Sequence, residues 1–285
     1  MSVADWTSYK LRKRLGKITF FAVLSLAALI WLVPIIWMFS LSLTPNEILK
    51  TITTSLVPIK PTLANYIGVF QAGLTPRWFL NSIIVTVVTT VGTLVLCAMA
   101  GYAFARLEFK GKTVLFPFVL AGLMVPKEAM FIPLFLVFAQ FELHNTYAAL
   151  ILPRVAAPLG VFIMTQFLKA IPRDIEEAAE LDGASRWTIF WKIMLPMSLP
   201  ALTALGIFTF ILTWNDYLWP LVSATEKEMF TITTGLASLQ GNFAQATELG
   251  SLMARGVLAS APLLLLFLIF QRQLIRGIAV GSGGK

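Results

Sequence analysis

Six long apolar stretches constrain this chain more than any other feature of its sequence. They cover residues 18–46, 78–105, 113–141, 147–168, 193–215 and 250–271. A helix that crosses the hydrocarbon of a bilayer needs about 20 predominantly apolar residues, and every stretch is at least that long. Because lipid offers no hydrogen-bond partners, the backbone of each stretch must bond within a helix. The sequence therefore predicts an all-α integral membrane protein with six transmembrane helices.

The prolines inside these stretches are predicted to kink the spans without breaking them. They are Pro34, Pro126, Pro133, Pro153, Pro158 and Pro262. The first stretch is longer than the core of a signal peptide, which has about 7–15 apolar residues, and no small-residue cleavage site follows it. We therefore expect the first stretch to be a retained span.

Composition supports a membrane protein and argues against several other classes. Only 13% of the residues are charged, about half the share in a soluble domain. The surplus of 22 basic over 14 acidic residues is attributed to cytoplasmic loops, not to a nucleic-acid partner. A single cysteine excludes a disulfide within the chain. With only one cysteine and one histidine, we expect no zinc site of the usual ligand types. No set of catalytic residues is found, so we expect no enzyme.

The positions of the basic residues orient the chain. Fifteen of the 22 lie in the N-terminal tail, the second loop, the fourth loop and the C-terminal end, all on one side of the predicted spans. Since cytoplasmic loops carry the excess of lysine and arginine, both termini are predicted to be cytoplasmic. This divides the chain into a cytoplasmic tail at 1–17, a six-helix domain at 18–276 and a cytoplasmic tail at 277–285.

The fourth loop, residues 169–199, is predicted to be structured. Asp174 stands three residues before Glu177, the spacing of a capping box at a helix start. Gly183 follows an Ala- and Glu-rich run, where a helix end favours glycine. Ser185 can cap a second, amphipathic helix. The loop is therefore expected to form a cytoplasmic knob of two helices. The alternative is a helix that lies flat on the lipid headgroups.

Specific residues of this loop resemble a known family. Glu177-Ala178-Ala179, three residues to Gly183, nine more to Ile193 and then Leu195-Pro196 fit the signature loop of binding-protein-dependent ABC importer permeases. Further segments resemble the carbohydrate-type subgroup, closest to the maltose-transporter subunit that pairs with a second permease. These segments are 79–82, 143–153, 214–220 and 270–272.

The resemblance implies that this loop carries a coupling helix, between the fourth and fifth spans, which docks on a cytoplasmic ATPase. The residues expected at or beside that contact are Glu176, Glu177, Ala178, Ala179, Leu181, Asp182, Gly183 and Ala184. Gly111-Lys112-Thr113 resembles the tail of a phosphate-binding loop, but Arg106 replaces the glycine that the motif needs. We therefore expect no cofactor on this chain, and ATP and Mg on the partner ATPase.

The resemblance also implies the partners and the cargo. A homologous second permease, an ATPase dimer and an extracytoplasmic substrate-binding protein would complete an importer in a bacterial or archaeal cytoplasmic membrane. The binding protein would deliver a di- or oligosaccharide to the outer loops, around 45–77 and 223–249, for transport by alternating access. Glycerol phosphate or a polyol is an alternative cargo. A stand-alone secondary transporter is the alternative from another class.

Charged and aromatic residues near the spans suggest a substrate pathway. Charges in lipid are costly and usually face a bundle interior or a watery cavity. The candidate pathway residues are Glu128, Arg154, Trp214, Asn215, Asp216, Tyr217 and Trp219. The alternative is structural, with the tryptophans in an aromatic belt and Asp216 paired with Arg154 or Arg255. Arg154 itself departs from the family pattern, in which an uncharged residue is expected.

Overall fold

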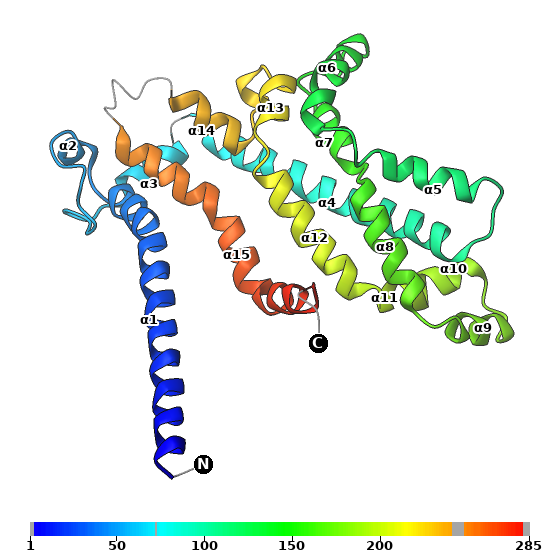
Figure 1. The fold of residues 1–285 in the computed structure, drawn as a ribbon. Coiled ribbons are helices and arrows are strands. Elements are labelled where there is room, and N and C mark those ends of the chain that lie inside the picture. The colour runs from blue at the N-terminus through cyan, green and yellow to red at the C-terminus, as the bar shows by residue number, and fades with distance from the viewer. Residues whose placement is uncertain (1–2, 72, 241–247, 282–285) are drawn as a thin grey trace. The chain divides into compact units, whose positions relative to one another are not determined.

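The computed structural model describes residues 3–71, 73–240 and 248–281, and all regular secondary structure in that part of the chain is helical (Figure 1). Parts of the predicted outer loops and tails, namely residues 1–2, 72, 241–247 and 282–285, lie outside the described residues. The chain divides into two compact units. The first comprises Met1–Gly73 and Gly241–Leu258, and the second comprises Leu74–Gln240 and Ala259–Lys285.

The first unit holds α1 (Val3–Ser42), α2 (Asn46–Leu49), α3 (Ala64–Gln71) and the start of α15 (Leu249–Gly281). Side-chain amides organise it. Asn65 Nδ2 donates to the carbonyls of Ser42 and Thr44 at 2.9 and 2.8 Å. Asn46 donates to Asn65 Oδ1 at 3.1 Å and accepts from the Gly250 amide at 2.7 Å. The two asparagines thus tie the start of α15 to the turn that follows α1.

The second unit is built around α4 (Thr75–Arg106), against which α7 (Tyr147–Val155), α8 (Pro158–Ala170) and α12 (Leu199–Trp214) pack (Figure 1). Small residues permit the close approach of α4 and α8. A Cβ on Gly101 would lie 2.6 Å from the Cβ of Met164, and one on Gly160 would lie 2.6 Å from Cys97 Sγ. Any larger residue at either glycine would force the two helices apart.

Shorter elements complete the second unit. They are α5 (Lys112–Ala121), a 3-10 turn (Lys127–Met130), α6 (Phe131–Gln140), α9 (Asp174–Leu181), α10 (Arg186–Ile189), a π-helical turn (Phe190–Met194), α11 (Leu195–Met197), α13 (Leu218–Ser223), a second 3-10 turn (Lys227–Met229), α14 (Ile232–Gln240) and the rest of α15.

The predicted all-α membrane architecture is confirmed, although the structure does not show six uninterrupted spans. Within the described residues, three helices are long and apolar enough to cross a membrane: Lys13–Ser42, Thr75–Arg106 and Leu249–Gln273. Two bent pairs pass the same test, α7 with α8 at 43° and Arg186–Met197 with α12 at 72°. The predicted span 113–141 is divided between α5, a 3-10 turn and α6.

The prolines explain where helices are interrupted. Pro34, Pro153 and Pro262 lie inside α1, α7 and α15, as predicted. Pro133 lies in the first turn of α6, but the prediction was wrong at Pro126, which precedes the 3-10 turn where the third predicted span is divided. Pro158 begins α8 after a bend of 43° from α7, and these two helices together are long and apolar enough for one span. A proline has no N–H and disfavours helical backbone in the residue before it, so a helix often starts there.

The break before Pro158 is supported by side chains of α4. The Thr93 hydroxyl donates to the Val155 carbonyl at 3.3 Å, and the Cys97 thiol donates to the Ala157 carbonyl at 3.5 Å. Carbonyls that a broken helix leaves free must find partners when no water is near. The interruption between α7 and α8 is therefore a supported feature of the fold.

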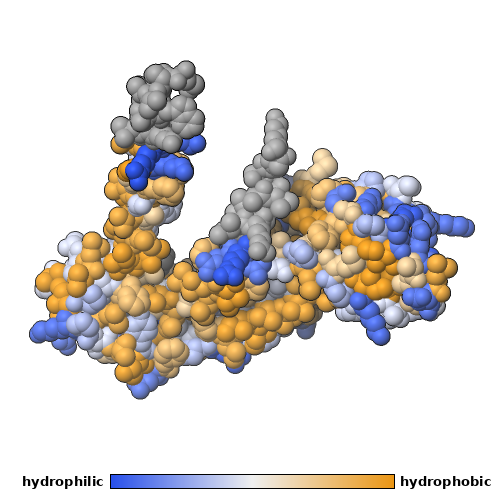
Figure 2. Space-filling view, turned by 90° about the horizontal axis from the view of Figure 1, so that it is seen from below, coloured by the Kyte–Doolittle hydropathy of each residue, from blue (hydrophilic) through white to orange (hydrophobic). Residues whose placement is uncertain are grey.

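Apolar side chains remain exposed on several helices, in keeping with a chain covered by lipid or by another membrane chain. Figure 2 shows hydrophobic residues over much of the face in view, with hydrophilic residues gathered in patches. The exposed apolar residues include Leu24, Leu26 and Leu29 of α1, Val87, Val88 and Val91 of α4, Ile132 and Leu136 of α6, and Leu264, Leu265 and Leu268 of α15.

Candidate coupling segment and transport pathway

The segment between α8 and α12 forms the predicted two-helix knob. It contains α9, then α10 continued by the π-helical turn and α11. The start of α9 differs from the prediction, because Asp174 is the first helical residue and makes no capping bond. The amides of Glu176 and Glu177 donate instead to the Arg173 carbonyl, at 2.8 and 3.0 Å. The acidic residues of this first turn suit the positive end of the helix dipole.

The end of α9 confirms the predicted role of Gly183. This glycine has φ +81°, a left-handed conformation that a side chain would strain. The Gly183 amide donates to the Glu180 carbonyl and the Ala184 amide to the Ala179 carbonyl, both at 3.0 Å. These two bonds define a Schellman motif. Ser185 then caps α10 as predicted, since its hydroxyl accepts from the Thr188 amide at 3.2 Å.

The predicted contact residues of this segment divide between its inner and outer faces. Ala179 is buried in the main core cluster, and Ala184 packs against the same cluster. Exposed residues include Glu177, Ala178, Asp182, Gly183 and Leu181, whose side chain is 89% exposed.

Two tryptophans extend the exposed face of the segment. Trp187 is 60% exposed and Trp191 is 42% exposed. Neither ring was among the contact residues expected from the sequence. Trp191 lines an apolar cavity with Leu199 of α12 and Phe270 of α15, whereas Trp187 is the more exposed ring of the segment.

Glu176 faces inward, toward the end of α4. Its Oε1 lies 2.7 Å from Nε of Arg106 in an ion pair whose side chains are 14% and 4% exposed, respectively. The second contact of Arg106 runs from Nη2 to the Ile171 carbonyl at 2.5 Å. Burial raises the pKa of the Glu176 carboxyl above its ordinary value of 4.5, although the Arg106 charge opposes this.

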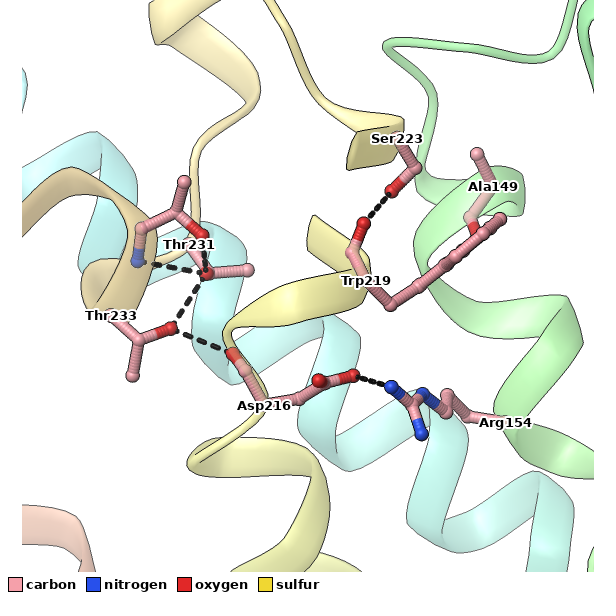
Figure 3. A network of polar contacts seen from close by, with 8 residues as sticks. Ala149, Arg154, Asp216, Trp219, Ser223, Thr231 and Thr233 are labelled. Carbon is pink, nitrogen blue, oxygen red and sulfur yellow. Dashed lines mark hydrogen bonds and ion pairs between the residues drawn. The ribbon is translucent and has the colours of Figure 1, made fainter. Parts of the chain in front are cut away.

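The candidate pathway contains a second ion pair, between Arg154 at the end of α7 and Asp216 between α12 and α13 (Figure 3). Their side chains are 20% and 14% exposed. The Asp216 carbonyl also accepts from the Thr233 hydroxyl at 2.8 Å. The pair therefore joins two places where helices are interrupted, and it is one of the two pairings that the sequence suggested.

The two tryptophans of the candidate pathway are packing residues in this conformation. Trp214 is 3% exposed and donates from Nε1 to the Ala259 carbonyl at 2.9 Å. Trp219 is 1% exposed and donates to the Ala149 carbonyl at 2.8 Å. In this conformation neither ring is exposed for contact with a sugar or a lipid headgroup. Glu128, Asn215 and Tyr217 are exposed.

Comparison with known proteins decides the family. Residues 94–280 match the family described as binding-protein-dependent transport system inner membrane component. The chain belongs to this family. It is therefore a membrane permease subunit, as the signature loop indicated.

Relatives and a solved structure agree with this assignment. The permease is 40% identical to the arabinooligosaccharides transport system permease protein AraQ of Halalkalibacterium halodurans, over 81% of this chain and 82% of the relative. It is 36% identical to the trehalose transport system permease protein SugB of Mycobacterium tuberculosis, over 88% and 92%. A chain in the crystal structure of a bacterial ABC transporter involved in alginate import has the same fold, with a TM-score of 0.80, 24% identity and coverage of 95% and 98%.

Two of the subgroup motifs of the permease, 79–82 and 143–153, meet at one buried asparagine near the start of α4. Asn81 Nδ2 donates to the carbonyls of Glu228 and Phe230 at 2.8 and 2.9 Å, and its Oδ1 accepts from the Tyr147 hydroxyl at 2.7 Å. Asn145 Oδ1 accepts from the amides of Thr225 and Glu226 at 2.7 and 2.9 Å. The motifs thus fix the segment between α13 and α14, and their role in this structure is to hold the fold.

Proposed function

We propose that this permease forms half of the membrane pathway of an ATP-driven importer for a di- or oligosaccharide. The carbohydrate class is supported by relatives of 40% and 36% identity that are named for arabinooligosaccharides and trehalose. Glycerol phosphate and polyols remain the alternative cargo. The transport energy comes from a separate ATPase dimer that binds ATP and Mg, and this chain supplies no cofactor of its own.

The observation that carries the proposal is the outward face of α9. Leu181 is 89% exposed on a short helix outside the candidate spans, beside exposed Glu177 and Ala178. The small side chain of Ala178 allows another helix to approach closely, and Leu181 offers an apolar anchor. This face suits a cleft in the ATPase better than a flat lipid surface, because an acidic residue lies beside the apolar one and anionic headgroups would repel it.

The proposed cycle involves the cytoplasmic side of the permease, where α9 lies, and the outer side, where the sugar enters. With both termini cytoplasmic, closure of the ATPase dimer displaces α9, and the pathway shared with a homologous second permease opens outward. A binding protein delivers the sugar to the outer loops. The sugar passes exposed Asn215 and Tyr217 beside the Arg154–Asp216 pair, since transport sites often lie where membrane helices are broken. Hydrolysis then returns the permease to its inward state.

Reconstitution tests this function directly. The permease is placed in lipid vesicles with a second permease, an ATPase and a binding protein from the same cells, and uptake of radiolabelled di- and oligosaccharides, glycerol 3-phosphate and a polyol is compared. We expect ATP-dependent uptake of a disaccharide or longer sugar only. Uptake of glycerol phosphate or the polyol alone would reassign the cargo. Uptake by the permease alone, without ATP, would favour a secondary transporter and overturn the proposal.

A further inference from the structure

Arg106, the last residue of α4, contacts both sides of the turn that enters the coupling segment. Its Nη2 donates to the carbonyl of Ile171, which ends α8, and its Nε pairs with Glu176 in the first turn of α9. One turn earlier on α4, the ring of Tyr102 lies 5.2 Å from the ring of Phe190, which begins the π-helical turn. The end of α4 therefore contacts α9 itself and the chain on either side of it, at Ile171 before α9 and at Phe190 after it.

Stability alone does not explain a charged contact at this place. Arg106 and Glu176 are both largely removed from water, at 4% and 14% exposure. Removing two charges from water costs free energy that their attraction often fails to recover, and apolar side chains of similar size are commonly as stable. An apolar pair, however, would not fix the orientation of one helix relative to another, because its contacts have no preferred direction. The planar guanidinium donates a directed hydrogen bond to the Ile171 carbonyl while its charge lies against Glu176, so one rigid group joins the end of α8 and the start of α9 to α4.

We propose that Arg106 is a positioning residue that links the coupling helix to α4, so that displacement of α9 by the ATPase moves the inner end of the transmembrane core. The inference rests on the proposed function. It follows from the contacts of Arg106 and from the close packing of α4 on α8, where Gly101 and Gly160 leave no space for slippage. A helix of 32 residues carries such a movement over about 48 Å, at 1.5 Å per residue.

A matched ion pair provides the control. Lys112 Nζ lies 3.1 Å from Glu108 Oε1, close to Arg106 in sequence, but Glu108 is 82% exposed and the pair joins the turn after α4 to the first residue of α5, without reaching α9. Lys112→Gln therefore removes a positive charge near the same helix end without releasing α9. Arg106→Gln removes the charge that joins α9 to α4. Arg106→Lys keeps the charge but can hold only one of the two acceptors in place.

The experiment measures sugar transported per ATP hydrolysed in the complete reconstituted importer. We expect Arg106→Gln to assemble and to hydrolyse ATP, while the ratio falls about tenfold, within the range produced by residues of a coupled network. Arg106→Lys should recover part of the ratio, and Lys112→Gln should match wild type. A ratio unchanged in Arg106→Gln, or a loss of transport that only follows a loss of assembled complex, would overturn the proposal.

Hydrogen exchange on the purified permease separates this inference from the proposed function. Amides of residues 174–181 should exchange faster in Arg106→Gln than in wild type or Lys112→Gln, because α9 loses its attachment to α4. If wild-type importer fails to couple ATP to uptake, the proposed function fails, and exchange still tests the attachment. Equal exchange in all three proteins would show that Arg106 does not position α9.

Discussion

Two ion pairs of the second unit lie largely out of water, and each joins segments that are distant in the sequence. Arg106 and Glu176 join α4 to α9, whereas Arg154 and Asp216 join α7 to the break between α12 and α13. In both pairs, the surrounding protein shields the charged groups from water more than in an exposed pair. The energetic consequences of losing one partner should therefore be larger than at the surface.

Removal of one charge from the Arg154–Asp216 pair should destabilise the permease. Asp216→Asn leaves a guanidinium that is 20% exposed without its counter-charge, at a cost of about 3 kcal/mol, near the low end for a broken buried pair. The double variant Arg154→Met/Asp216→Leu should regain most of this free energy. Unfolding in mixed detergent micelles measures both, with Glu108→Gln as the exposed-pair control. Equal losses in the single and double variants would contradict the expectation.

Glu176 gives the coupling segment a defined pH dependence. Its pKa in the folded permease is raised above 4.5, chiefly by burial, so the folded state binds the proton more readily than the unfolded state. Stability contributed by this group therefore increases as the pH falls through the raised pKa toward 4.5, and is absent at higher pH.

Glu176→Gln should remove that dependence. The difference in melting temperature between wild type and Glu176→Gln should shift in favour of wild type as the pH is lowered toward 4.5. Glu108→Gln is the control, because Glu108 is 82% exposed and pairs with Lys112, away from α9. A difference that stays constant with pH would refute the assignment of the raised pKa to Glu176.

At the scale of elements, most local signals were read correctly, whereas of the long-range contacts described above only the pairing of Asp216 with Arg154 was among those that the sequence suggested. Gly183 and Ser185 act on backbone groups a few residues away, so their roles at the two helix ends could be predicted. The capping role of Asp174 failed because the Arg173 carbonyl already accepts the amides of the first turn. The attachment of Glu176 to Arg106 depends on how α4, α8 and α9 pack, which no local pattern contains.

A pair of glycines tests the turn after α9. Gly183 and Gly111 both have positive φ, at +81° and +88°, and a Cβ at either would meet no other atom within 4 Å. Alanine should therefore strain the backbone equally, by about 1 kcal/mol. Only Gly183→Ala alters the turn of the coupling segment, so only this variant should lose ATPase in a pull-down from mild detergent. Gly183→Asp and Glu177→Lys should lose it more completely. Equal ATPase recovery with both alanine variants would argue against docking at this turn.

At the scale of the whole molecule, hydropathy predicted the membrane architecture but not how continuous each span is. The stretch 113–141 has the composition of one span, yet its helix ends at Ala121 and resumes beyond Pro126. Composition indicates whether a segment lies in lipid or in water. Whether its helix is continuous depends on prolines and on neighbouring side chains, such as those of Thr93 and Cys97, that donate hydrogen bonds to the carbonyls at a break. The burial of Trp214 and Trp219 could not be predicted from composition either. Each indole N–H donates to a carbonyl, of Ala259 and Ala149, that only the fold brings close.

The orientation of the chain is the whole-molecule property on which the proposed cycle depends, and single cysteines can test it. Cys97 is buried, so a Cys97→Ala background removes it as a label site. Thr54 and Leu181 are both exposed, the first between α2 and α3 and the second on α9. With cytoplasmic termini, a membrane-impermeant maleimide should label Thr54→Cys in intact cells and Leu181→Cys only in inverted vesicles. The reverse pattern would place α9 on the outer side, where no ATPase could reach it, and would remove the basis for coupling through this helix.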